Sequence, residues 1–210
     1  MIGSHEPDTG ELIRRAASGD REAVDRLLAR HRDRLRRMVA IRMDKRLAAR
    51  LDPSDIVQDA LNDASRKLLD YLQHQPLPFY PWLRQLAWKR LIAEHRRHVG
   101  AQGRTVTREE HDAMPLPDHS ASQLAAQLLS RDTSPSGRLI RKELGAKVQQ
   151  MLSQMSPPDR EVLVLRYLEQ LSTAETAAVL GLTVDGVKSR QRRALVRFSN
   201  QLADHSQGDL

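Results

Sequence analysis

The sequence contains no cysteine, which excludes disulfide bonds and any metal or iron–sulfur site held by thiolates. Aromatic residues make up only 3% of the chain, so a core must be built from Leu, Ala, Val and Ile, a composition that favours helices. No stretch approaches the roughly 18 consecutive apolar residues of a membrane span, and residues 1–10 lack the features of a secretory signal. We expect a cytoplasmic helical protein without membrane insertion.

Basic residues are in excess, with a formal net charge of +7 and a pI near 10.2. This balance favours a polyanionic partner, either nucleic acid or an anionic membrane surface. Net charge alone is weak support for either, so the position of the charge along the chain carries the argument.

The 210 residues separate into three regions. Apolar residues recur at helical spacing in residues 10–100 and again in residues 138–203, whereas residues 101–137 are rich in Gly, Pro, Ser and Thr. Residues 123–129 are compatible with one short helix inside that stretch. The sequence predicts an all-α protein with two small helical domains joined by a flexible linker, the second domain containing a helix-turn-helix.

The helix-turn-helix is predicted in residues 173–192, TAETAAVLGLTVDGVKSRQR. Ala177 falls where two helices meet, and Gly181 falls at a turn that favours positive φ. Val187 then packs the second helix against the first. This spacing is typical of DNA-binding helix-turn-helix motifs.

The second helix of the motif has two faces at 100° per residue. Residues 184–197 contain five basic residues and Asp185, a local charge of +4, as a helix in the major groove requires. The alternative is an ordinary helical hairpin with a solvated basic surface. One side gathers Val187, Gln191, Ala194, Leu195 and Phe198, and the other Asp185, Ser189, Arg192, Arg193 and Val196, with Lys188 on its flank.

A helix with an acidic face is predicted from Asp52, with Pro53 at its first position. Residues 52–70 hold five aspartates and two basic residues, a local charge of −3. Such a face suits docking of a basic partner protein, although a solvated surface explains the charge as well. The buried stripe is predicted at Ile56, Ala60, Leu61, Ala64 and Leu68, and the outer face at Asp55, Gln58, Asp59, Asn62 and Asp63.

A basic helix with aromatic residues is predicted over residues 82–98. Single-stranded DNA requires positive charge for its backbone, offered by Lys89 and Arg96, and rings for its unpaired bases, offered by Trp88. The alternative is that the aromatics belong to the core, which is the expectation for Phe79 and Trp82. His95 and His98 lack a third ligand, so no metal is expected.

The chain shows no phosphate-binding glycine loop, catalytic triad or His-Glu metal motif. We therefore expect no cofactor and no enzymatic activity.

Taken in order, these motifs resemble those of the extracytoplasmic-function (ECF) sigma factors of bacterial RNA polymerase. Residues 52–59, DPSDIVQD, are similar to the family's polymerase-binding helix. Residues 79–87, FYPWLRQLA, resemble its next helix, and residues 157–162, PPDREV, with 187–194, VKSRQRRA, resemble its region 4.

The resemblance implies the partners and the residues that meet them. The first domain would bind core polymerase and the downstream promoter element, the second would read the upstream element, and an anti-sigma factor is a further candidate partner. Two positions depart from the family: Lys89 stands where Asn is usual, and Ala93 where an acid is usual, with Glu94 beside it. By position, polymerase would meet Asp55, Gln58, Asp59 and Asn62; the downstream element Lys89, Arg96 and Trp88; and the upstream element Lys188, Ser189, Arg192 and Arg193.

Two other classes fit parts of the sequence. A two-domain transcriptional regulator with an N-terminal sensing or dimerisation domain shares the helix-turn-helix but needs no acidic docking helix. A helical adaptor without a DNA role has no reason to combine the turn pattern with the basic helix. Co-purification with core polymerase distinguishes these classes, because only the sigma factor requires it.

Overall fold

A computed structural model describes residues 8–99, 116–129, 150–152 and 154–207. Within these ranges the regular structure is helical throughout and no strand occurs, so the predicted all-α fold is confirmed. The chain divides into two units, residues 1–40 with 46–101, and residues 41–45 with 102–210.

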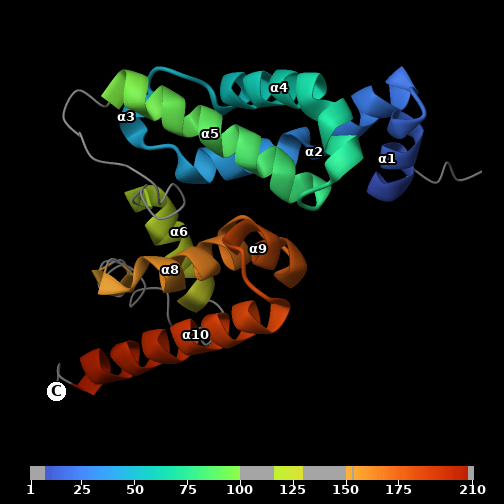
Figure 1. The fold of residues 1–210 in the computed structure, drawn as a ribbon. Coiled ribbons are helices and arrows are strands. Elements are labelled where there is room, and N and C mark those ends of the chain that lie inside the picture. Colours follow the sequence, from blue (N-terminus) through green and yellow to red (C-terminus); the bar gives the residue numbers. More distant parts are fainter. Residues whose placement is uncertain (1–7, 100–115, 130–149, 153, 208–210) are drawn as a thin grey trace, which may run out of the picture. The chain divides into compact units, whose positions relative to one another are not determined.

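The first unit is built on a pair of long adjacent helices, α4 and α5 (Figure 1). Aspartates begin two of the preceding helices: Asp8 accepts from the backbone N–H of Glu11 at 2.7 Å, and Asp20 from that of Ala23 at 3.0 Å. Leu12, Leu27 and Leu35 are buried beneath these helices. The helices are α1 (Thr9–Ala17), α2 (Arg21–Arg42), α3 (Lys45–Ala48), α4 (Pro53–His74) and α5 (Phe79–Val99).

The start and end of α4 follow from its sequence. Asp52 caps the helix by accepting from the N–H of Ser54 at 2.7 Å, and Pro53 occupies the first turn. This hydrogen bond lowers the pKa of Asp52. At the other end Gln75 adopts a left-handed conformation with φ 39°, and a proline-rich segment leads into α5.

An aromatic cluster holds α4 and α5 together. The rings of Tyr71 and Trp82 stack with centroids 4.4 Å apart, and Phe79 meets Tyr71 edge-on at 5.4 Å. Phe79 and Trp82 are buried, as predicted.

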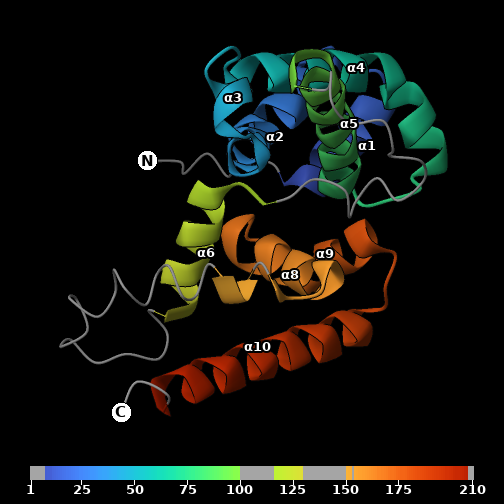
Figure 2. The same ribbon diagram turned by 90° about the vertical axis from the view of Figure 1, so that its left-hand side faces the viewer.

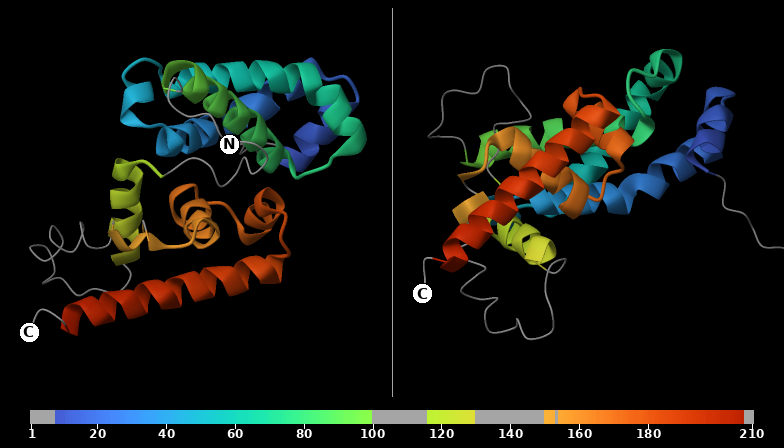
Figure 3. Two further views of the ribbon diagram at one scale, coloured as in Figure 1. Left: turned by 60° about the vertical axis from the view of Figure 1, so that its left-hand side comes forward. Right: turned by 90° about the horizontal axis from the view of Figure 1, so that it is seen from below.

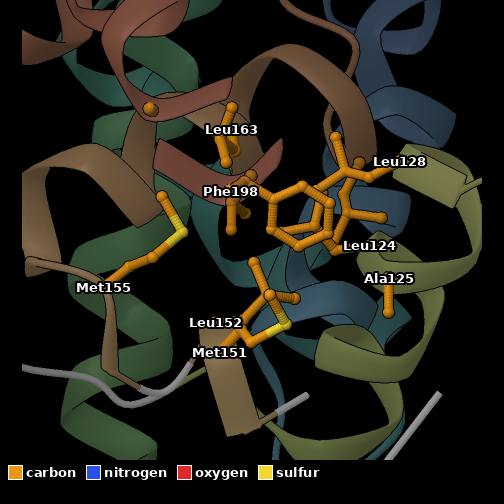
Figure 4. Packing of buried hydrophobic residues seen from close by; sticks show 11 residues of the cluster. Leu124, Ala125, Leu128, Met151, Leu152, Met155, Leu163 and Phe198 are labelled. Atoms are coloured by element: carbon orange, nitrogen blue, oxygen red, sulfur yellow. The ribbon is translucent and has the colours of Figure 1, made fainter. Parts of the chain in front are cut away.

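The second unit is organised around α10, which runs beneath α8 and α9 in Figure 2. Among the helices that the structure describes in this unit, all but α9 contribute apolar residues to its core (Figure 4). The helices are α6 (Asp118–Leu129), α8 (Pro157–Leu163), the π-helix η3 (Val164–Leu168), α9 (Thr173–Leu180) and α10 (Val184–Gln207), and the core contains Leu124, Ala125, Leu128, Met151, Leu152, Met155, Leu163, Val164, Leu168, Ala194 and Phe198.

Helix α6 corrects the predicted linker, residues 101–137. Residues 118–129 form a helix beside the short helices α8 and η3 (Figure 3). Leu124, Ala125 and Leu128 of this helix are buried in the core of the second unit. The short helix expected at 123–129 is therefore present and begins earlier, at residue 118, and this segment is not part of a flexible tether; residues 101–115 and 130–137 lie outside the described residues. The apolar side of α6 packs against η3 and is thereby removed from water.

A buried charge network lies in the second unit, which includes residues 41–45. The Arg42 guanidinium donates to the Glu161 carboxylate at 2.7 and 2.8 Å, and to one oxygen of Glu169 at the same two distances. Burial lowers the pKa of Arg42, but the two carboxylates raise it more, so its pKa lies above the usual value. Loss of either partner from such a pair is strongly destabilising.

Candidate nucleic-acid interface and partner-docking face

The helix-turn-helix is fixed by local hydrogen bonds at both ends of α9. Ser172 and Glu175 form a capping box: the Glu175 N–H donates to the Ser172 hydroxyl at 3.1 Å, and the Ser172 N–H donates to the Glu175 carboxylate at 2.8 Å. Gly181 ends α9 in a left-handed conformation, with φ 62° and ψ 31°. The Leu182 N–H then donates to the Ala177 carbonyl at 3.0 Å, so the predicted turn is present where the sequence places it.

Helix α10 is held by the face that the sequence predicts. Val187, Ala194 and Phe198 are buried, and Leu195 packs partly buried against the same core. Gln191, at the edge of this face, donates to the Tyr167 hydroxyl at 3.0 Å. The opposite face of α10 therefore has a fixed orientation.

That opposite face carries the predicted upstream-element residues. Lys188, Arg192 and Arg193 are exposed, and Ser189 is half-buried among them. These donors suit phosphate oxygens and guanine edges. The structure brings all four residues onto one surface of α10.

Asp185, in the first turn of α10, is a further exposed residue to which the sequence assigned no role. The Thr183 hydroxyl accepts from the Gly186 N–H at 3.0 Å and caps the helix. The Asp185 carboxylate projects into solvent, 90% exposed, and lies 3.2 Å from the Lys188 ammonium. In the sequence, Asp185 differs from its neighbours as the one negative charge among the basic residues of 184–197.

The downstream-element residues are only partly brought together. Lys89 and Arg96 are exposed on α5, but Trp88 is 2% exposed and lies in the core, with the buried guanidinium of Arg84 5.6 Å from its ring centre. We correct the assignment of Trp88, because its ring is not presented to a base. The first half of α5 is enclosed on more than one side, which its pattern of basic and aromatic residues did not indicate.

The acidic face of α4 is exposed at four of its five predicted positions, whereas Asp63 is half-buried. Asp55, Gln58, Asp59 and Asn62 are all exposed, and the Gln58 amide donates to the Asn62 carbonyl at 3.2 Å. The predicted stripe on the opposite side is buried at Ile56, Ala60, Leu61, Ala64 and Leu68.

Two arginines of α2 border this face, and sequence reasoning missed them. Arg32 donates to the Gln58 carbonyl at 2.8 Å, and Arg36 donates to the Ser54 hydroxyl at 3.2 Å. Farther along α4, Asp63 pairs with Arg90 of α5 at 2.6 Å, and this hydrogen bond raises the pKa of Arg90. No periodicity within α2 reveals these partners, because they depend on how separate helices pack.

Comparison with known proteins gives consistent matches. The profile of Sigma-70, region 4, matches residues 145–198. The RNA polymerase sigma-E factor of Streptomyces avermitilis is 33% identical, over 69% of this chain and 80% of that protein. The ECF RNA polymerase sigma factor BldN of Streptomyces coelicolor is 25% identical, over 92% of this chain and 66% of that protein.

Two further relatives match nearly end to end. The ECF RNA polymerase sigma-E factor of Escherichia coli is 25% identical over 91% of this chain and 92% of its own. Among solved structures, CnrH in complex with the cytosolic domain of CnrY is 26% identical, with a TM-score of 0.50, over 92% of this chain and 96% of that chain.

The chain therefore belongs to the ECF subfamily of RNA polymerase sigma factors, the non-enzymatic subunits that bind RNA polymerase core enzyme and promoter DNA in transcription initiation. In the described part of the chain, no helix has the length and apolar character required to cross a membrane.

Proposed function

We propose that the two units divide the work of promoter recognition. The first unit docks on core polymerase through Asp55, Gln58, Asp59 and Asn62 of α4 and contacts the downstream element through Lys89 and Arg96 of α5. The second unit reads the upstream element through Lys188, Ser189, Arg192 and Arg193 of α10. The protein acts in the cytoplasm, where RNA polymerase and the genome are found.

The observation that supports this division is the opposite sign of two exposed faces. The α4 face presents carboxylates, which repel DNA phosphates and suit a basic protein surface, together with neutral amides. The α10 face presents basic side chains on the second helix of a helix-turn-helix, where DNA is read.

A protein that controls access to these surfaces is a further proposed partner. The similar protein CnrH was solved with the cytosolic domain of CnrY bound. By analogy, we include a protein that binds and blocks the sigma factor, an anti-sigma factor, among the proposed partners of this chain.

Charge reversal on α4 tests the docking face. Asp59→Arg places a cation among the proposed contacts, so we expect the complex with core polymerase to be lost on gel filtration while circular dichroism shows unchanged helicity. Asp70→Arg is the matched control, since Asp70 lies on the same helix with an 83% exposed side chain, about 16 Å farther along the axis than Asp59 and beyond the proposed contacts. It should leave the complex intact. A normal complex with Asp59→Arg would refute the docking face.

A further inference from the structure

An acceptor and a donor are paired at the start of the DNA-reading helix. The Asp185 carboxylate and the Lys188 ammonium lie 3.2 Å apart, with side chains 90% and 64% exposed. An ion pair this exposed contributes little to stability. Both groups are therefore available to a ligand.

The position of the pair matches where base edges are read. In helix-turn-helix proteins the N-terminal residues of the second helix reach the bases in the major groove. Asp185 and Lys188 lie in the first turn and a half of α10, whereas Arg192 lies about 10 Å farther along the axis than Asp185 and about 6 Å farther than Lys188, at 1.5 Å per residue.

Gly186 allows the Thr183 cap to form at the start of the helix that carries this pair. It has no side chain, and a Cβ atom there would meet the Thr183 hydroxyl at 3.0 Å and disturb the cap of α10.

The chemistry of the pair matches a guanine–cytosine base pair. In the major groove, guanine offers acceptors at N7 and O6, and cytosine offers the N4 amino donor next to them. The Lys188 ammonium can donate to guanine while the Asp185 carboxylate accepts from cytosine. A carboxylate here also repels phosphates, so it weakens binding wherever no amino group meets it.

We propose that Asp185 and Lys188 together read one guanine–cytosine pair of the upstream element, and that Asp185 is a specificity-determining residue. This inference rests on the proposed function, because it requires that α10 read promoter DNA.

The test uses the full chain with core polymerase. Holoenzyme selects from a library of randomised duplex DNA, and every single-base-pair change of the selected sequence is then measured for binding. We expect one guanine–cytosine position at which substitution weakens binding about 5- to 150-fold.

Two variants and a control assign that position to Asp185. Asp185→Ala should reduce discrimination at this position alone, because Lys188 can still donate to guanine, and it should bind non-specific DNA as tightly as the native chain or more tightly. Asp185→Asn should move the preference there towards adenine, which an amide recognises through N6 and N7. Asp70→Ala removes the same charge from α4 and should change neither the base preference nor the binding of non-specific DNA.

Three outcomes would overturn the inference: unchanged discrimination in Asp185→Ala, equal weakening on all sequences, or loss of stability with the same base preference, which would mean that Asp185 only supports the helix N-terminus. Failure of the proposed function looks different. In that case native holoenzyme would select no sequence, or its preference would survive substitution of Lys188, Arg192 and Arg193 together.

Discussion

At the scale of single residues, the turn of the helix-turn-helix depends on Gly181. Its φ of 62° is a conformation that side chains with a Cβ atom adopt at a cost, although space around it is open. We expect Gly181→Ala to lower the free energy of unfolding of the second unit by about 1–2 kcal/mol, measured by urea denaturation followed by circular dichroism.

Gly181→Asn is the control for this substitution. Asparagine tolerates the left-handed conformation better than alanine, so it should recover part of the loss. Equal stability of the alanine variant and the native chain would show that the turn does not hold this geometry in solution.

At the scale of elements, α6 belongs to the core of the second unit. Leu124 is fully buried there among the side chains of η3 and α10. Leu124→Ala should therefore destabilise the second unit by about 2–5 kcal/mol in the same urea experiment. Gln123→Ala, at the exposed neighbouring position, should change stability by less than about 0.5 kcal/mol. Similar values for the two variants would contradict the packing of α6.

The same scale shows what sequence reasoning reaches and where it stops. Caps, turn glycines and apolar stripes are local, so the start of α4, the turn at Gly181 and the buried face of α10 were all predictable. Helix α6 was expected only as a short helix over residues 123–129, and its place in a core was missed, because Gly, Pro, Ser and Thr around it gave residues 101–137 the composition of a linker. Trp88 was misassigned because periodicity gives the direction of a side chain but not how many neighbours surround it. Arg32 was missed because its partner lies on another helix.

At the scale of the whole molecule, the net positive charge is the sum of surfaces of opposite sign. A chain of net charge +7 carries an exposed acidic face on α4 and an exposed basic face on α10. The α4 face is itself mixed, since Arg32 and Arg36 reach its polar residues. A partner that docks there must therefore match both signs, which favours selectivity over simple attraction.

The scarcity of aromatic residues gives the first unit an optical label of its own. Both tryptophans, Trp82 and Trp88, are buried in α5 of the first unit, and no other tryptophan occurs in the chain. Tryptophan emission therefore reports unfolding of the first unit alone, whereas far-ultraviolet circular dichroism reports the helices of both. The Gly181→Ala variant should lower the urea midpoint seen by circular dichroism and leave the emission midpoint where it is in the native chain. A matching shift in emission would mean that the two units unfold as one cooperative body.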